Sequence, residues 1–156
     1  MEDKQALLRQ ITPQAVLKAL TPEAKKSIVK HAITKEFIGI WELPINIGRE
    51  SRRENHFRTN ITEQENVSMT KPGSDIYLID TGEYLQISRQ HLQIKKTDSG
   101  YILFDTGSAC GTFVNEAKIG GDSKNGSTKL SDGDIIKIGT EISSYLYQFI
   151  TLKIKE

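Results

Sequence analysis

Apolar residues follow two different periods along the chain, and the change comes near residue 37. Before it they recur three or four residues apart, the period of an amphipathic helix. These positions are Leu7, Leu8, Ile11, Val16, Leu17, Leu20, Ile28, Val29, Ala32 and Ile33. Thr12-Pro13 and Thr21-Pro22 each place a capping residue before a proline, which is tolerated at the first helical position. We therefore expect two or three short helices, broken near residues 12 and 21, in a helical N-terminal extension spanning residues 1–36.

From Phe37 onward the pattern consists of short runs rich in β-branched and aromatic residues. The runs are FIGI and INIG on either side of a proline, then IYLI, YLQIS, HLQIKK, YILFD, GTFVN, IIKIG and YLYQFITLKI. Turn signals separate them, at Asp98-Ser99-Gly100, Gly120-Gly121-Asp122, Lys124-Asn125-Gly126 and Ser131-Asp132-Gly133. Many short strands joined by turns predict an all-β sandwich or barrel over residues 37–156. A parallel βαβ fold is disfavoured because few helix-length segments remain.

Residues from about 50 to 74 do not fit either period. This stretch is polar, and long loops in compact domains are often functional. We expect an extended loop. Its basic residues Arg52, Arg53, His56 and Arg58 would either add positive potential to a nearby site or form a solvated surface.

Composition narrows the classes of function. The 21 basic and 20 acidic residues leave a net charge of +1, which argues against a dedicated nucleic-acid binder. The single cysteine, Cys110, rules out an internal disulfide and fits a reducing compartment. No signal peptide is visible, and no stretch has the roughly 18 apolar residues that a membrane span needs. We expect a cytoplasmic protein that binds neither nucleic acid nor membrane.

Four motifs stand at the ends of the predicted strands. They are Gly48-Arg49, Ser88-x-x-His91, the stretch Asp105-x-x-Ser108-x-x-Gly111-Thr112-x-x-Asn115, and Asp132-Gly133-Asp134. Each alone occurs often by chance. In this order, and between residues 37 and 153, they resemble the forkhead-associated (FHA) domain family. The resemblance implies a β-sandwich of the FHA/SMAD type with about eleven strands, and phosphothreonine recognition by loops at one end.

The chemistry of phosphate recognition agrees with the residues that these motifs supply. A phosphate monoester has about −1.5 to −2 charges and three strong acceptor oxygens, so it needs fixed donors. Arginine offers a planar, permanently charged fork, and serine adds a hydroxyl. The resemblance implies that the phosphate and the peptide are contacted by Arg49, Ser88, Arg89 and Cys110. It assigns a supporting role in the loops to Gly48, His91, Thr112 and Asn115.

The chain departs from the family pattern at two places. Ala109-Cys110 stands where relatives often have Thr-Asn, and Glu116 replaces a glycine that usually follows Asn115. A lost hydrogen bond costs about 0.5–1.5 kcal/mol, so affinity for a phosphopeptide would drop. Two functions therefore stay open. One is a phosphothreonine-dependent interaction module acting as a signalling adaptor. The other is an FHA-fold scaffold that binds partners, or itself, without phosphate.

Catalysis and metal binding find no support in the sequence. Ser88, His91 and Asp105 could suggest a triad, but no nucleophile elbow surrounds the serine. His31 and His56 lack metal-ligand spacing. We expect no enzymatic activity, no metal and no cofactor.

The partner implied by the resemblance is a protein that contains a phosphothreonine. Thr12 and Thr21 lie in Thr-Pro steps close to the domain, so the protein's own phosphorylated N-terminal tail is a second candidate partner. Helix capping accounts for both threonines as well.

Overall fold

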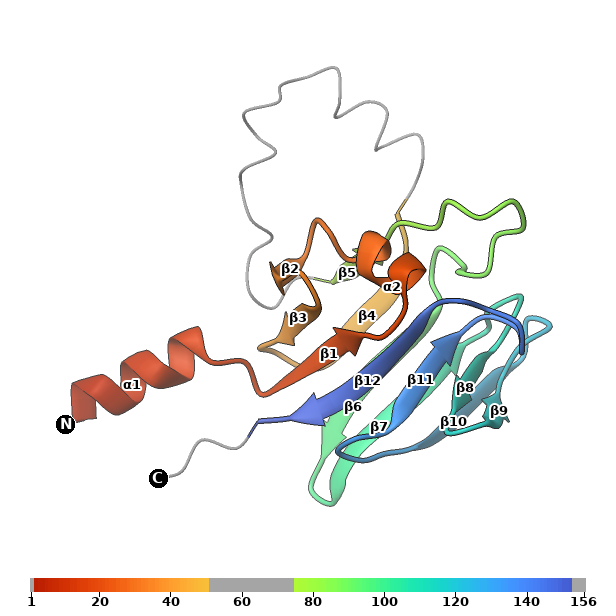
Figure 1. Ribbon diagram of the computed structural model, residues 1–156. Helices are drawn as coiled ribbons and strands as arrows, with labels where there is room; N and C mark the ends of the chain where they lie inside the picture. The colour runs from red at the N-terminus through yellow and green to blue at the C-terminus, as the bar shows by residue number, and fades with distance from the viewer. Residues whose placement is uncertain (1, 51–74, 153–156) are drawn as a thin grey trace.

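Two β-sheets face each other in the computed structural model, which describes residues 2–50 and 75–152 (Figure 1). The strand order is β2-β3-β1-β12-β11-β8-β9 in one sheet and β10-β7-β6-β4-β5 in the other. The strands are β1 (Ala15–Ala19), β2 (Ala32–Thr34), β3 (Phe37–Ile40), β4 (Ile45–Arg49), β5 (Ile76–Leu78), β6 (Leu92–Thr97), β7 (Gly100–Thr106), β8 (Thr112–Val114), β9 (Ala117–Ile119), β10 (Asn125–Leu130), β11 (Ile135–Ile138) and β12 (Leu146–Thr151). The predicted β-sandwich is confirmed, with 12 strands among the described residues where about eleven were expected.

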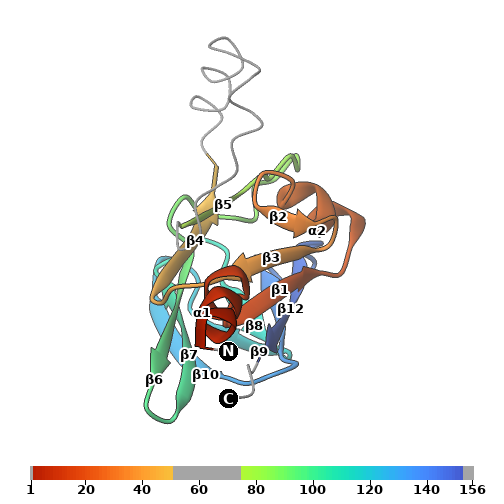
Figure 2. The same cartoon turned by 90° about the vertical axis from the view of Figure 1, so that its left-hand side faces the viewer.

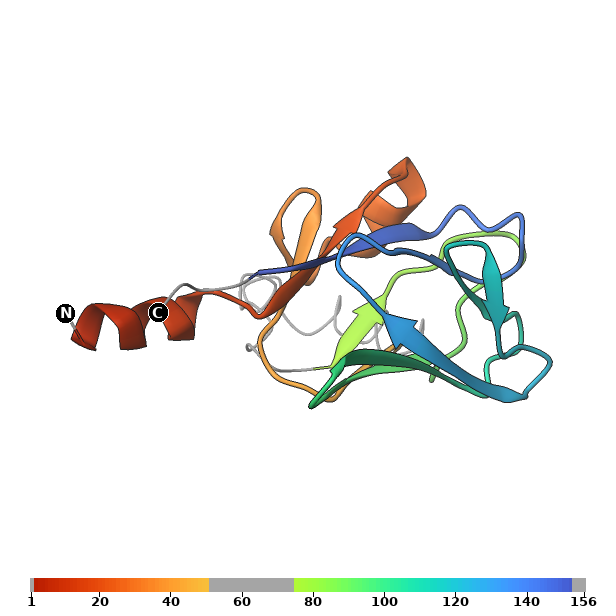
Figure 3. The same cartoon turned by 90° about the horizontal axis from the view of Figure 1, so that it is seen from below.

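Figure 3 shows the two layers from below. Side chains that alternate along the strands fill the space between them. On β4, Ile45 and Ile47 are buried and Asn46 is exposed, because successive side chains of a strand point to opposite faces. On β12, Tyr147 and Phe149 face the same core. These apolar side chains therefore form the core between the two sheets.

The helical prediction for residues 1–36 is wrong over much of that segment. Helices occupy only α1 (Glu2–Ile11) and α2 (Pro22–Ser27). The stretch Ala15–Ala19 is strand β1, which is paired between β3 and β12, and Ala32–Thr34 is strand β2. The run AVLKA is too short for its period to decide between helix and strand. Hydrogen-bonding partners on both sides, and burial of four of its five residues, favour the strand.

The predicted breaks near residues 12 and 21 and the cap at Thr21 are confirmed, whereas the cap expected at Thr12 is wrong because a strand and not a helix follows it. Helix α1 ends at Ile11 and projects from one end of the sandwich (Figures 1 and 2). The Thr21 side chain caps α2 by accepting the Ala24 N–H at 3.1 Å. The Thr21 hydroxyl also donates to the carbonyl oxygen of Ser144, which ties α2 to the loop before β12.

Two further predictions of local structure are wrong. The run YLQIS, residues 84–88, forms no strand and lies in the loop between β5 and β6. Lys124-Asn125-Gly126, expected as a turn, instead leads into strand β10, the polar edge strand of the five-stranded sheet. The extended loop predicted at about 50–74, with Arg52, Arg53, His56 and Arg58, lies outside the described residues except for Glu50.

Three loops meet at one rim of the sandwich. Strands β4 and β6 are antiparallel with Ile47 opposite Leu92, so the end of β4 and the start of β6 share this rim. The Gly139 N–H, after β11, donates to the Gly111 carbonyl at 2.9 Å, which brings in the loop between β7 and β8. No helix among the described residues is long and apolar enough to cross a membrane.

Candidate functional site

Gly48 and Arg49 end β4 against the turn that contains Ser88. The backbone N–H of Arg49 donates to the Ser88 carbonyl at 2.9 Å. Gly48 passes this turn so closely that a Cβ there would lie 1.9 Å from the carbonyl oxygen of Arg89. A side chain at position 48 would thus clash with backbone, which gives the supporting role predicted for Gly48 a steric basis.

The guanidinium group of Arg49 is oriented by the same turn. Its Nη1 donates to the Ile87 carbonyl at 2.9 Å, and the side chain is half-buried. A guanidinium has five N–H donors in a rigid fork, so one anchored N–H fixes the direction of the others. Because Ile87 directly precedes Ser88, one short segment positions both the charged group and the hydroxyl.

Glu50, the acidic neighbour of Arg49, is directed to another cation. Its Oε1 lies 2.6 Å from Lys30 Nζ, and the Glu50 side chain is 6% exposed. This ion pair joins the end of β4 to the segment after α2. The negative charge next to the site is therefore compensated by Lys30.

The Ser88 hydroxyl connects the turn to the loop between β7 and β8. Its Oγ accepts the Ala109 N–H at 3.0 Å. A hydroxyl has one proton and two lone pairs, so this bond leaves the Ser88 proton available for an acceptor such as a phosphate oxygen. The fold therefore brings together Arg49, Ser88 and Ala109-Cys110 at the rim.

His91 is fully buried, and backbone groups occupy both of its ring nitrogens. Nδ1 accepts the Ser88 N–H at 2.9 Å, which places the ring proton on Nε2, 2.8 Å from the Gly111 carbonyl. Burial lowers the pKa of His91 below its ordinary value of 6.5, against the opposing effects of the Gly111 carbonyl and Asp105. A neutral imidazole thus joins the Ser88 turn to the loop that ends at Gly111.

Ser88, His91 and Asp105 lack the bonding of a catalytic triad. In a triad the imidazole is hydrogen-bonded to the nucleophile on one side and to the carboxylate on the other. Here the Ser88 hydroxyl meets a backbone N–H, and His91 Nε2 lies 3.9 Å from Asp105 Oδ2, beyond hydrogen-bond distance. The arrangement suits a structural brace.

The Asp105 carboxylate organises the 107–111 loop. It accepts the N–H groups of Gly107 and Ser108 at 3.0 and 2.8 Å and the hydroxyls of Ser108 and Thr112 at 2.6 and 2.8 Å. The Ser108 hydroxyl in turn accepts the Gly111 N–H at 2.9 Å. Sequence reasoning named Thr112 and missed Asp105 and Ser108 as supports. The signal was present in Asp105-Thr-Gly, because an aspartate often bonds the backbone two residues further on.

Cys110 and Arg89 lie on the outer side of this arrangement. Cys110 Sγ is 3.5 Å from the Leu85 carbonyl, a weak hydrogen bond to the loop between β5 and β6. Arg89 is exposed and forms no ion pair with any described residue. The thiol therefore contacts the protein itself, while the Arg89 guanidinium lies in solvent.

Asn115 stabilises the turn between β8 and β9, which lies away from the rim. Its amide Nδ2 donates to Asp134 Oδ1 at 2.8 Å, and its Oδ1 accepts the Ile135 N–H at 2.9 Å. Asn115 and Glu116 have φ of 48° and 76°, the left-handed region that asparagine tolerates and glutamate disfavours. The glycine missing at position 116 would have fitted this turn.

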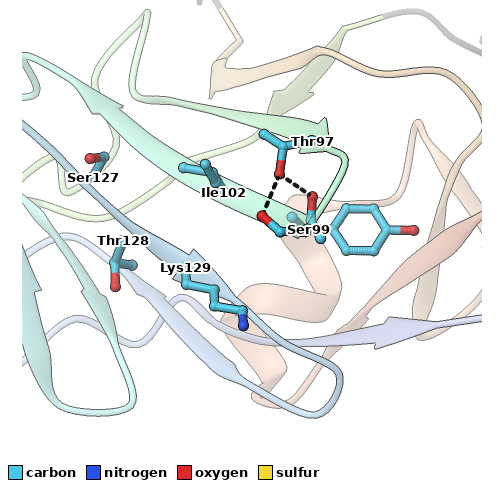
Figure 4. A pocket seen from close by; sticks show the side chains of 8 residues that line it. Thr97, Ser99, Ile102, Ser127, Thr128 and Lys129 are labelled. Atoms are coloured by element: carbon cyan, nitrogen blue, oxygen red, sulfur yellow. Dashed lines mark hydrogen bonds between the residues drawn. The ribbon is translucent and has the colours of Figure 1, made fainter.

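A shallow groove lies away from this site, at the hairpin end of β6 and β7 (Figure 4). Its lining residues are Thr97, Ser99, Gly100, Tyr101, Ile102, Ser127, Thr128 and Lys129. Thr97 bonds Ser99 and the Gly100 carbonyl across the turn. The groove contains no residue that the motifs single out, and no cluster of potential metal ligands occurs in residues 2–50 and 75–152.

Comparison with known proteins finds matches over the β region. The sequence profile of the FHA domain family matches residues 45–139. An FHA domain-containing protein of Arabidopsis thaliana is 35% identical over 78 residues, which cover 50% of this chain and 18% of that protein. The oxoglutarate dehydrogenase inhibitor of Corynebacterium jeikeium is 40% identical over 68 residues, 44% of this chain and 40% of that protein. The chain thus spans less than half the length of these relatives.

A solved structure agrees with the fold. It comes from a structural and functional analysis of phosphothreonine-dependent FHA domain interactions, and its TM-score is 0.51. The alignment covers 90% of this chain and 98% of that one, at 19% identity. At this identity the likeness concerns the architecture of the sandwich.

Proposed function

Because the chain belongs to the FHA domain family, we propose that it binds partner proteins through a phosphorylated threonine, at the rim formed by Arg49, Ser88 and the 107–111 loop. The protein then acts as a phosphothreonine-dependent signalling adaptor without catalytic activity. The FHA domain with a TM-score of 0.51 was studied for phosphothreonine-dependent interactions, which supports this class of ligand.

One observation carries the proposal: Arg49 and Ser88 meet at a single backbone segment. The Arg49 N–H bonds the Ser88 carbonyl, and its guanidinium bonds the carbonyl just before it. A fixed positive fork beside a hydroxyl whose proton is available matches the charge and the acceptors of a phosphate monoester. Support by buried His91 and Asp105 keeps these donors preorganised, which reduces the ordering cost on binding.

Titration of a phosphothreonine peptide library, followed by calorimetry with the best peptide, tests the proposal. We expect Arg49→Ala to weaken binding by about 10- to 100-fold, because hydrogen bonds to charged groups contribute about 1.5–3 kcal/mol. Arg9→Ala, on α1 and exposed, is the control and should bind like the wild type. Equal affinity of Arg49→Ala, or of the unphosphorylated peptide, would refute phosphate-dependent binding.

Phosphate-independent binding is the second candidate function. The observation that favours it is Cys110, whose sulfur contacts the Leu85 carbonyl where relatives often present an asparagine to the peptide. The variant Cys110→Asn distinguishes the two functions. If phosphate recognition is the function, this variant should bind the phosphothreonine peptide several-fold more tightly than the wild type. A scaffold would bind phosphorylated and bare partner segments equally, with or without this substitution.

We propose the protein's own phosphorylated tail as a second ligand, bound by the rim of another molecule. Thr21 already uses its hydroxyl on α2 and on Ser144. Thr12 lies before Ala15, at the end of β1 that is far from the rim. The other end of β1, Ala19, pairs with Tyr147 and lies next to the rim. Four residue-to-residue steps along the strand separate these ends by about 13 Å. Phosphorylation at Thr12 should therefore cause concentration-dependent association in sedimentation, abolished by Arg49→Ala. A phosphorylated chain that stays monomeric would exclude it.

A further inference from the structure

Asp80 organises the loop between β5 and β6 from its interior. The residue is 4% exposed. Its carboxylate accepts three backbone N–H groups, from Gly82, Gln86 and Ile87, at 3.0, 2.7 and 3.0 Å. Hydrogen bonds to an ionised carboxylate are roughly twice as strong as neutral ones. They wrap residues 81–87 around one side chain, which is why this run forms no strand.

A buried tyrosine provides the fourth donor. The Tyr145 hydroxyl donates to Asp80 Oδ1 at 2.9 Å, and the residue is 5% exposed. Burial, together with the bond to Asp80, raises the pKa of Tyr145 to about 12, so the hydroxyl keeps its proton near neutral pH. The segment before β12 is thereby attached to the loop before β6.

A second contact joins the same two loops. The Gln86 side-chain oxygen accepts the backbone N–H and the hydroxyl of Thr140 at 2.8 and 3.1 Å. The backbone N–H of Gln86 meanwhile bonds Asp80. The loop between β5 and β6 is therefore bonded at two points to the segment between β11 and β12. The first of these loops continues directly to Ser88.

Ile87 connects these contacts to the proposed phosphate-binding site at the rim. Its N–H donates to Asp80 and its carbonyl accepts from Arg49 Nη1. We propose that Asp80 and Tyr145 are positioning residues of the site: they fix Ile87 and, through it, the Arg49 guanidinium and the Ser88 hydroxyl. This inference rests on the proposed function, since it assigns the two residues a role in phosphothreonine binding.

Tyr147 offers a matched control for a purely structural effect. It is buried on β12, two residues beyond Tyr145, and its hydroxyl lies 2.6 Å from Ser27 Oγ. Tyr147→Phe thus removes a buried hydroxyl from the same part of the chain whose hydrogen bond goes to Ser27 and not to Asp80 or the 81–87 loop. A general loss of stability would affect both tyrosine variants, whereas loss of positioning would affect only Tyr145→Phe.

Two measurements on each variant test the proposal: its affinity for a phosphothreonine peptide and its unfolding in urea. The variants are Tyr145→Phe, Asp80→Asn and Tyr147→Phe. Tyr145→Phe should weaken binding about three- to tenfold. Asp80→Asn should weaken it more than about tenfold, because its amide N–H groups would face backbone donors. Tyr147→Phe should stay within about twofold, even if it unfolds at lower urea. Equal losses in the two tyrosine variants, or no loss in Tyr145→Phe, would overturn the inference.

Spectra of the protein without peptide separate this inference from the proposed function. In Tyr145→Phe we expect the NMR signals of the Gln86 and Ile87 amides and of the Arg49 Nε–H to shift, and those in Tyr147→Phe to remain in place. If the wild type binds no phosphothreonine peptide, the proposed function fails, and these signals still decide the positioning role. Unchanged signals in Tyr145→Phe would overturn it, and this variant suffices if Asp80→Asn does not fold.

Discussion

The Arg49 guanidinium donates a hydrogen bond to the carbonyl of Ile87 at 2.9 Å, so the direction of the charge at the rim is set by backbone. The bond also joins the end of β4 to the residue just before Ser88. A substitution that keeps the positive charge at position 49 but loses the bond to Ile87 therefore distinguishes the effect of the charge on binding from the effect of its orientation.

Arg49→Lys should weaken phosphothreonine binding about tenfold or more. A lysine ammonium lacks the planar fork with which arginine bonds the Ile87 carbonyl and still presents paired N–H groups to two phosphate oxygens. Calorimetry of the wild type, Arg49→Lys and the control Arg9→Lys measures the effect, since Arg9 is exposed on α1 and should tolerate the exchange. If both variants lost affinity equally, the anchored orientation of Arg49 would not matter.

Gly48→Ala should lower the free energy of unfolding by about 2–3 kcal/mol, in the range of overpacked sites, and should weaken peptide binding. The added Cβ would meet the Arg89 carbonyl at 1.9 Å, so β4 must move away from the Ser88 turn. Gly82→Ala is the milder comparison, because its Cβ would lie 3.3 Å from Asp80 Oδ1 and from the Tyr84 carbonyl, which is tight but far from the 1.9 Å clash at position 48. Urea unfolding compares the two. Similar stability of both variants would contradict the close approach.

His91 should make the protein less stable as the pH falls below neutrality. Burial lowers the pKa of His91 below 6.5, so the unfolded chain takes up a proton at a higher pH than the folded chain does. Stability rises with pH wherever the unfolded state binds more protons. The contribution is thus present above pH 6.5 and is lost as the pH falls through 6.5 toward the lower pKa of the folded state.

Urea unfolding at about pH 7.5, 6.5 and 5.5 checks this dependence, in a range above the usual carboxyl pKa values. His91→Gln should be less stable at pH 7.5 and should show a flatter decline. An equally steep decline in the variant would assign the pH dependence to other groups.

Glu116→Gly should stabilise the protein by about 0.5–1 kcal/mol. Glu116 has φ of 76°, which costs an L-residue about 1–2 kcal/mol, and the greater freedom of glycine in the unfolded chain offsets part of the gain. Thermal unfolding measures the shift, and peptide affinity should not change. The control is Ala117→Gly, at the start of β9, which should be destabilising. If Glu116→Gly also lowered the stability, the turn would not be strained.

The site was only partly readable from sequence. The order of Gly48-Arg49 and Ser88-x-x-His91 placed these residues at strand ends, and the fold brings them to one rim. Their binding roles stay predictions. Asp80 was missed although Asp80-Thr81-Gly82 is the same local signal as Asp105-Thr-Gly, with its bond to the Gly82 N–H two residues on. What no local pattern encodes is its bond to Tyr145, 65 positions away.

The sequence by itself determined the all-β architecture after Phe37, because alternation of apolar residues and turn chemistry act between near neighbours. Only the tertiary structure decided that Ala15–Ala19 is a strand and that YLQIS is a loop. In the first case β3 and β12 supply backbone partners. In the second the Asp80 carboxylate takes the N–H groups that a neighbouring strand would have bonded. Both choices depend on where backbone hydrogen bonds find partners, which is a property of the assembled sandwich.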